Sequence, residues 1–329
     1  MFLHRLAKVR APEFPTDLVW LNGEKQTLRK LKGKVVLVDF WSYSCVNCQR
    51  TLPHVQKLYE RYAELGLMVI GVHTPEFEFE HKEENVRVAI KAAGISYPVV
   101  MDNEYDVWHL YANNAWPHCF LVGADGVIVY DHVGEGGYAA TEKAVQEALI
   151  AAGVTTPLPM VPDDKETDEA ACYRTTPELY LGYLRGKYGN SEEFLPDVAE
   201  AFTDHGVQKE DVPYLHGHWK ICGEYVEHSK ELAVASEYVA VKYSGFGVNV
   251  VLVAEEPAEV WLELDGLPLP ADMRGEDVKV NKDETTSVKV DEARMYNLVQ
   301  ASVYHKGTLK MKVKASQVRF YALTFTGCT

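Results

Sequence analysis

The period of the apolar residues changes along this chain, and that change most limits the folds open to it. Between about residues 18 and 153, continuous apolar runs such as "KVVLVDFW" alternate with segments of helical period. A continuous run of this length is typical of a strand buried on both faces. After about residue 212 the period becomes two, as in "EVWLELDG" and "TLKMKVKA". The sequence therefore predicts an α/β unit with an antiparallel edge, followed by an antiparallel β-sandwich.

The length and one biased segment predict where the chain divides. A chain of 329 residues is long for a single core, so two domains are expected. The segment "TTPLPMVPDDKETDEAA" is rich in proline and acidic residues and has no apolar period, which is typical of a linker. We predict a first domain over residues 1–154, a linker over 155–172 and a second domain over 173–329. In the second domain, "TPELYLGYLRGKYG" suggests a short leading helix.

Local signals place several elements of the first domain. The helical pattern "LPHVQKLYERYAEL" follows the first buried strand, and "KEENVRVAIKAAG" should end at Gly94. The segment "CFLVGADGVIVYDHV" reads as a hairpin that turns at Asp125 and Gly126. Thr141 is a candidate cap for a last helix over "ATEKAVQEALIAAG".

The charge balance excludes some classes of partner. Asp and Glu number 48 against 33 Lys and Arg, a net charge of −15 that disfavours nucleic acid and anionic membranes. No apolar run is long enough to span a bilayer, and "MFLHRLAKVR" has no apolar stretch behind it, so it makes a poor signal peptide. We expect a cytoplasmic protein. The alternative is an exported domain whose leader or membrane segment has been removed.

Two cysteines stand two residues apart at the end of a predicted strand. Cys45 and Cys48 lie in "VVLVDFWSYSCVNCQRTLP", while the other four cysteines are scattered. A structural zinc site needs a second such pair or a downstream histidine pair, and the sequence has neither. Two inert buried thiols would not require a strand before them and a helix after them. A cysteine at a helix N-terminus is favoured as thiolate, so the pattern indicates a redox pair with no metal and no organic cofactor.

Residues 35–53 resemble the active site of the thioredoxin fold, and their surroundings resemble TlpA/ResA-type redoxins. The likeness extends over most of the chain through "FWSYSCVNCQRTLP", "GVHTPEFEFE", "GEGGY" and "TPELYLGYLRG", and it is greatest to the thioredoxin-like and β-sandwich region at the C-terminus of DipZ proteins. The resemblance implies a thioredoxin-like mixed sheet with flanking helices and a thiol–disulfide oxidoreductase activity.

The resemblance assigns roles to individual residues. Cys45 would be the attacking thiolate and Cys48 the resolving thiol, one helical turn further on. Asp39 matches the buried carboxylate of thioredoxins and would take the proton of Cys48; the alternative is a solvated acid at a strand end. Trp41 would pack beside the disulfide as a wall; the alternative is a plain core residue, and both can be true.

Two prolines match the thioredoxin-like pattern as well. Pro53 sits inside the helical pattern at the expected offset from Cys45, where it should kink the helix. Trp116 and Pro117 precede the hairpin strand, where such folds carry a cis-proline and pair with extended substrate; a trans turn proline is the alternative.

Other features depart from the family pattern or stay open. The residues between the cysteines, Val46 and Asn47, are not those of well-known redoxins, so the reduction potential cannot be read by analogy. Cys119 near Pro117 is expected to be a buried strand residue more often than a third redox partner, and His118 a packed histidine. Cys222 and Cys328 are candidates for pairing, which sequence alone cannot decide.

The second domain resembles a carbohydrate-binding module with a jelly-roll sandwich. Such modules stack sugar rings on exposed aromatic side chains, for which the sequence offers Trp219, Tyr225, Tyr243, Phe246 and Trp261. The sequence thus predicts a dithiol enzyme that acts on protein disulfides and is recharged by a dithiol protein or a low-molecular-weight thiol. The alternative is a binding protein that recognises a glycan or a protein, with the dithiol secondary.

Overall fold

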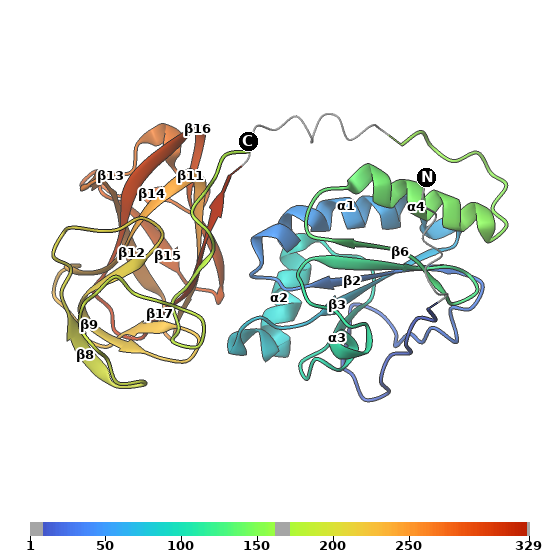
Figure 1. Cartoon of the computed structure of the whole chain (residues 1–329), viewed down its shortest axis with the longest axis horizontal. Coiled ribbons are helices and arrows are strands. Elements are labelled where there is room, and N and C mark those ends of the chain that lie inside the picture. Colours follow the sequence, from blue (N-terminus) through green and yellow to red (C-terminus); the bar gives the residue numbers. More distant parts are fainter. Residues whose placement is uncertain (1–8, 162–171, 328–329) are drawn as a thin grey trace. The chain divides into compact units, whose positions relative to one another are not determined.

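A computed structural model describes residues 9–161 and 172–327 of the chain. Contacts divide the chain into two compact units, Met1–Glu169 and Ala170–Thr329. Each unit contains its own sheet (Figure 1). The first is called here the redoxin unit and the second the C-terminal unit.

The redoxin unit is built on a six-stranded mixed sheet of order β1-β4-β3-β2-β5-β6. Its central strands β2, β3 and β4 are parallel, and β1, β5 and β6 pair antiparallel. The bounds are β1 (Trp20–Leu21), β2 (Val35–Trp41), β3 (Leu67–His73), β4 (Val99–Met101), β5 (His118–Val122) and β6 (Ile128–Val133). Every residue of β2 is buried, as its continuous apolar run predicts. The predicted hairpin at Asp125 and Gly126 joins β5 and β6.

Helices cover both faces of this sheet. Figure 1 shows α1 and α4 side by side over one face. Val107 and Trp108 of α3 pack against Val36, Val38 and Phe40, so α3 covers the other face. The bounds are α1 (Val46–Tyr62), α2 (Glu83–Ala93), α3 (Asp106–Leu110) and α4 (Tyr138–Ala151), with short 3-10 turns η1 (Ala63–Leu65) and η2 (Glu78–His81).

The predicted helix ends were partly right. The α2 helix ends at Gly94 in the left-handed region with φ 67°, which confirms the glycine stop. Thr141 is not a cap: α4 begins three residues earlier, after Gly137 at φ 59°. The hydroxyl of Thr141 instead donates to the carbonyl of Gly137 at 3.0 Å, inside the first turn of the helix. A glycine able to adopt this conformation lets the helix start before the threonine.

The C-terminal unit contains one antiparallel sheet in its described residues. Eleven strands take part, and the path runs β14-β15-β12-β16-β11-β17-β10-β9-β8, with β13 on β12 and β7 on β17. The bounds are β7 (Leu179–Tyr180), β8 (Ala199–Phe202), β9 (Pro213–Ile221), β10 (Val226–His228), β11 (Glu237–Ala254), β12 (Ala258–Leu264), β13 (Leu267–Pro268), β14 (Lys279–Val280), β15 (Thr286–Val290), β16 (Arg294–Val313) and β17 (Val318–Thr326), with the 3-10 turn η3 (Ala271–Met273).

The long strand β11 joins different parts of this sheet. Its residues 238–241 pair with β9, and residues 247–254 pair with β17. The register shifts between Gly245 and Gly247, where Gly245 has φ 158° and leaves no room for a side chain beside Thr326. Because one strand serves two partners in turn, the sheet bends around a single buried core that includes Trp219, Tyr243 and Phe320.

The predicted short helix at the start of this unit is wrong. The segment "TPELYLGYLRGKYG" forms the short strand β7 and turns. Leu179, Leu181 and Tyr183 stand at every second position, and the Leu181 N–H donates to the Tyr321 carbonyl at 2.8 Å. Gly182 lies very close to the backbone of Glu224. A Cβ atom on residue 182 would lie 2.1 Å from the carbonyl carbon of Glu224. This close approach and the period of two favour an extended segment over a helix.

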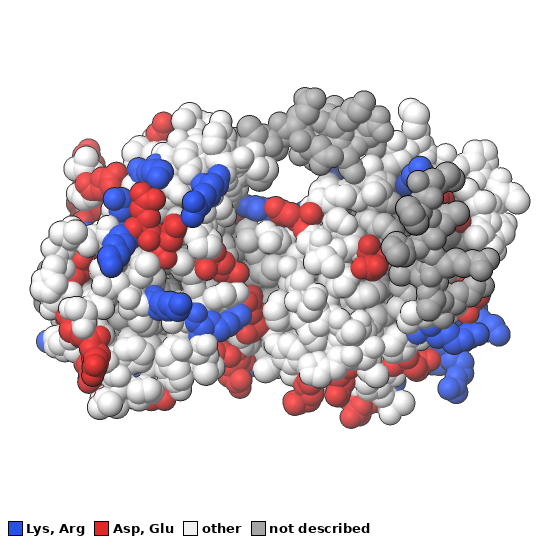
Figure 2. Space-filling view, viewed as in Figure 1, with Lys and Arg blue, Asp and Glu red and all other residues white. Residues whose placement is uncertain are grey.

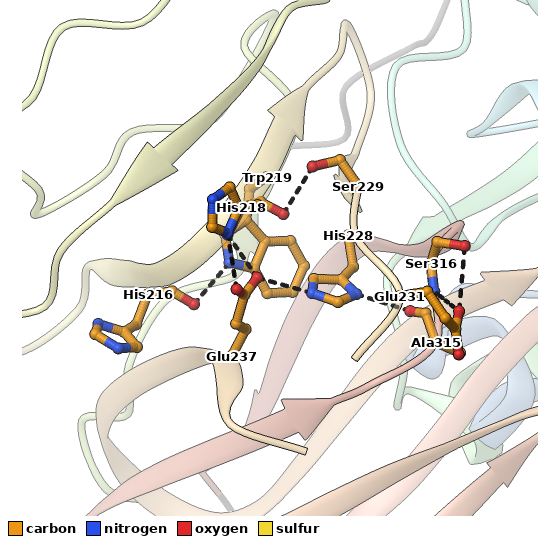
Figure 3. A network of polar contacts seen from close by, with 9 residues as sticks. All are labelled: His216, His218, Trp219, His228, Ser229, Glu231, Glu237, Ala315 and Ser316. Carbon is orange, nitrogen blue, oxygen red and sulfur yellow. Dashed lines mark hydrogen bonds and ion pairs between the residues drawn. The ribbon is translucent and has the colours of Figure 1, made fainter. Parts of the chain in front are cut away.

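A polar network, with Glu237 and His228 buried in it, ties several strands of the C-terminal unit together (Figure 3). The Glu237 carboxylate contacts His228 Nε2 at 2.9 Å and His218 Nδ1 at 2.8 Å. His228 Nδ1 lies 2.7 Å from the carbonyl oxygen of Ala315. The network therefore links β9, β10, β11 and the turn before β17.

The surface carries charges of both signs. On the face seen in Figure 2, acidic and basic side chains intermingle over the C-terminal unit, so the acidic excess of the chain does not form one patch there. Among the residues that the structure describes, none of the helices combines the length and the apolar character needed to cross a bilayer.

Candidate active site

The two paired cysteines lie where the fold turns from β2 into α1. Cys45 is the N-cap residue of α1, with φ −78° and ψ 118°. Its sulfur accepts a hydrogen bond from the backbone N–H of Cys48 at 3.3 Å. The first N–H groups of a helix have no partner within the helix, and this contact supplies one for Cys48. The helix continues through Pro53 to Tyr62.

The two thiols differ in exposure. Cys45 is partly exposed, whereas Cys48 is buried with 1% of its surface accessible. Burial raises the pKa of Cys48 well above its ordinary value, and its contact with Cys45 raises it further. Both are free thiols in the structure. The geometry thus gives one sulfur that a partner can reach and one that must lose its proton inside the protein.

Asp39 lies on β2 behind the dithiol. Its side chain is 1% exposed, and its Oδ1 atom has no hydrogen-bond partner among the described residues. Burial raises its pKa from 3.8 to about 7. The charge of Asp39 in turn contributes to the raised pKa of Cys48 and of Cys119, so these three groups are electrostatic neighbours. A carboxyl group with a pKa near neutrality can both take up and release a proton.

A cavity of about 350 Å³ opens beside Asp39. It is lined by residues of β2, α1, β5, β6 and α4, all within the redoxin unit. Leu37, Val55 and Leu58 form apolar walls, and Pro117 and Cys119 also line it. A cavity that combines apolar walls with a buried acid of shifted pKa is a typical feature of a functional site.

The other predicted site residues lie at different depths. The Trp116–Pro117 peptide bond is cis, and Pro117 is buried at the start of β5. Trp116 is half-buried and packs on Trp108 with ring centroids 4.3 Å apart. Trp41 is only 1% exposed, so it belongs to the core and offers no surface to a substrate. A place for Trp41 as a wall beside the cysteines stays a prediction.

A buried carboxylate that the sequence analysis did not single out contacts the loop before Cys45. Glu80 of η2 has no exposed surface and accepts from the Ser42 hydroxyl at 2.8 Å. It also accepts from the Ser44 N–H at 3.2 Å and the Glu76 N–H at 2.6 Å, besides the Ser44 hydroxyl. Burial raises its pKa to about 7, although the bonds to Ser44, Glu76 and Ser42 act in the opposite direction. These contacts hold the loop that leads into Cys45.

Three further cysteines and one histidine can be placed. Cys119 lines the cavity, and burial raises its pKa far above the ordinary value. His118 is packed between Asn113 and Asp131, at 2.6 and 3.3 Å. Cys222 is a free thiol and Cys172 is disulfide-bonded. Cys328, the candidate partner of Cys222, lies outside the described residues.

Most of the aromatic side chains proposed for sugar stacking are not available. Trp219 and Tyr243 have no exposed surface, and Phe246 is 6% exposed, because all three fill the core of the C-terminal unit. Tyr225 and Trp261 are half-buried. Trp261 lines a cavity of about 370 Å³, where Lys314 lies 5.2 Å above its ring.

Each of the two units matches a known protein family. The redoxin family model matches residues 6–149, and the model described as a thioredoxin-like C-terminal domain matches residues 176–326. The protein DipZ of Mycobacterium tuberculosis is 43% identical over 175 residues, which cover 52% of this chain and 25% of DipZ. The chain therefore spans about a quarter of the length of that relative.

Two further likenesses concern the redoxin unit. The thiol-disulfide oxidoreductase ResA of Halalkalibacterium halodurans is 35% identical over 129 residues, covering 39% of this chain and 68% of ResA. A thiol:disulfide interchange protein of Chlorobium tepidum has a similar structure, with a TM-score of 0.38 and 25% identity over 44% of this chain and 98% of that one. On the likeness to ResA and the match of the family model, the chain belongs to the TlpA/ResA-type redoxin family and is related to DipZ.

Proposed function

We propose that this protein is a thiol–disulfide oxidoreductase in which Cys45 and Cys48 form the redox pair. The observation that carries the proposal is the asymmetry of the two thiols at the start of α1. Cys45 is the partly exposed N-cap, its sulfur accepts a hydrogen bond from the Cys48 N–H, and Cys48 is buried one turn further on. Family membership supports the same reaction, since the ResA relatives are named thiol-disulfide oxidoreductases.

The reaction follows from this asymmetry. The Cys45 thiolate attacks a disulfide of a partner protein, one partner sulfur leaves as a thiolate, and a mixed disulfide forms on Cys45. Cys48 then gives its proton to the Asp39 carboxylate while its sulfur attacks Cys45. The mixed disulfide breaks, the partner leaves with its second thiolate, and Cys45 and Cys48 are left oxidised. Asp39 is the base because it is the buried carboxyl whose charge acts on Cys48.

Two electrons must return to the pair before the next turnover. We propose that a dithiol protein or a low-molecular-weight thiol supplies them, since thiol exchange needs no metal or organic cofactor. Partner proteins would bind near Trp116 and Pro117, which precede β5.

Reduction of insulin disulfides with dithiothreitol as electron source tests this function. The full-length protein should accelerate precipitation of the insulin B chain, and Cys45→Ser and Cys48→Ser should each abolish the acceleration. Cys222→Ser is a matched control, because Cys222 is a free thiol of the C-terminal unit. Activity that survives Cys45→Ser would show that the pair is not the redox centre.

For the C-terminal unit we propose a sandwich of the kind found in carbohydrate-binding modules. The bend of β11 between its pairings with β9 and β17 supports two facing layers around one core. Recognition of a glycan or protein by this unit is the second candidate function, and Trp261 in its cavity is the observation that favours it. Binding to a panel of immobilised glycans should be lost in Trp261→Ala and kept in Tyr225→Ala if the cavity is the site.

A further inference from the structure

One row of side chains crosses three neighbouring strands on the face that α1 and α4 cover. Asp39 of β2 pairs with Cys119 of β5, and Cys119 pairs with His132 of β6. Residues directly opposite each other in antiparallel strands point to the same face, with Cβ atoms about 4.5–5.5 Å apart. An acid, a thiol and an imidazole therefore follow one another from the centre of the sheet to its edge.

All three residues line the cavity beside Asp39, and the cavity contains unsatisfied polar groups. Three buried side-chain atoms have no hydrogen-bond partner among the described residues: Asp39 Oδ1, His132 Nε2 and Thr51 Oγ1. Thr51, like the residues of the row, lines the cavity. Buried polar groups are normally satisfied by protein or by ordered water. A volume of about 350 Å³ has room for roughly ten water molecules at about 30 Å³ each.

The outer end of the row is shaped by the glycines of "GEGGY". Gly137 has φ 59°, and a Cβ at this position would lie 2.6 Å from Cε1 of His132. The absence of a side chain thus makes room for the imidazole at the edge of the cavity. His54, Lys57, Arg61 and Glu142 line the same cavity, and Lys57 and Arg61 are exposed, so the cavity reaches solvent on this side.

The groups around Asp39 are poor acceptors for its proton. The groups whose titration its charge affects are Cys48, Cys119 and Tyr97, all buried acids with raised pKa values. None of them is a base that could take the proton of Asp39 after each turnover. The imidazole of His132, in contrast, has two ring nitrogens, so it can accept a proton at one nitrogen and give up a proton from the other.

We infer that the row Asp39–Cys119–His132, with the cavity above it, is the path by which the proton taken up by Asp39 reaches solvent, and that His132 is its outer relay. This inference rests on the proposed function. Cys48 gives its proton to Asp39 as its sulfur attacks. Asp39 passes a proton through cavity water to His132, and the imidazolium releases one to bulk solvent. One proton leaves per disulfide formed, and no electrons move along the row.

The test is the rate of the resolving step in the full-length protein. A mixed disulfide is formed on Cys45 with a chromogenic aromatic disulfide, and release of the second chromophore is followed in a stopped-flow instrument. His132→Ala should slow this release by about tenfold at neutral pH, while formation of the mixed disulfide keeps its rate. Free imidazole in the buffer should restore the release in His132→Ala. His109→Ala, on the opposite face of the sheet, is the matched control.

A second variant separates the relay from packing. His132→Gln keeps hydrogen-bonding groups but cannot carry a proton, so it should be slow as well. Full-rate release in His132→Gln, or a slow His132→Ala that imidazole does not restore, would overturn the relay. If Asp39→Asn is slow while both His132 variants are fast, the proposed function stands and the path is wrong. If no mixed disulfide forms on Cys45 at all, the proposed function itself fails.

Discussion

Two buried carboxyl groups flank the cysteine pair, and they differ in one respect. Asp39 and Glu80 are both fully buried, and burial raises the pKa of each to about 7. The Oδ1 atom of Asp39 has no hydrogen-bond partner within residues 9–161 and 172–327, whereas the Glu80 oxygens receive two backbone N–H groups and two hydroxyls. A carboxyl oxygen without a donor can exchange a proton without breaking a hydrogen bond. A carboxyl held by several donors is a structural anchor, because its loss leaves those donors unpaired.

The comparison predicts that removing the charge of Asp39 stabilises the protein. The sign follows from the raised pKa. The folded state binds the proton more tightly, so the cost of the buried charge is absent below pH 3.8, grows with pH and is complete above about 7. A rise from 3.8 to about 7 corresponds to roughly 4 kcal/mol. Asp39→Asn should therefore raise the free energy of unfolding by up to this amount at pH 8, and hardly at pH 4.

Denaturant unfolding of both proteins at the two pH values measures this difference. Equal stabilisation at pH 4 and pH 8 would mean that the effect does not arise from the charge.

The same substitution should slow catalysis although it stabilises the fold. Only the resolving step needs the base, so Asp39→Asn should slow release of the mixed disulfide by about a hundredfold at neutral pH and leave its formation unchanged. Stopped-flow release of a chromogenic thiol reports each step separately. Equal effects on both steps, or none, would remove Asp39 from the mechanism.

Glu80→Gln should stabilise the protein much less than Asp39→Asn does, because lost hydrogen bonds offset the gain from removing its buried charge. The two carboxylate oxygens accept the N–H groups of Ser44 and Glu76, and an amide can accept only one of them. One buried backbone donor then faces the amide nitrogen, which costs about 2 kcal/mol. Thermal unfolding at pH 8 should show a smaller gain in stability for Glu80→Gln than for Asp39→Asn. An equal gain in the two variants would erase the distinction between the two carboxyls.

The serines that hold Glu80 offer a smaller test. Ser42→Ala removes one hydroxyl that contacts the carboxylate at 2.8 and 2.9 Å. The variant should lose about 1 kcal/mol of stability. The substitution should hardly change the loop before Cys45, so the rate of Cys45 alkylation should stay the same. Ser316→Ala, whose serine contacts an exposed glutamate in the C-terminal unit, is a control that should be neutral.

These two carboxyls also differ in whether the sequence alone could predict their roles. Asp39 was predictable because it interrupts a continuous apolar run at a fixed offset before Cys45. Glu80 was not, because "FEFEH" reads as an exposed charged segment, and its serine partners lie 36 and 38 residues away in the chain. The row from Asp39 to His132 needs the register of three strands, which apolar period alone does not give.

The secondary-structure elements also divide into those that the sequence predicted and those that it did not. Strands and helices with a clear period were predicted, from the buried β2 to the glycine stop of α2. The predictions were wrong where local backbone geometry determines the structure. Gly137 starts α4 ahead of Thr141. The close contact of Gly182 with Glu224 holds "TPELYLGYLRG" in an extended form. Trp41 lies in the core, which is one of the two compatible positions that the sequence suggested.

The central claim is that Cys45 is the attacking thiol and Cys48 the resolving one. Mass spectrometry of the full-length protein after reaction with a protein disulfide tests it most directly. Cys48→Ser should accumulate a mixed disulfide on Cys45, and the wild type should end with Cys45 joined to Cys48. Cys45→Ser should form no adduct, because Cys48 is 1% exposed and its pKa is raised. An adduct on Cys48 in Cys45→Ser, formed as fast as that on Cys45, or one on Cys119 in either variant, would contradict the account.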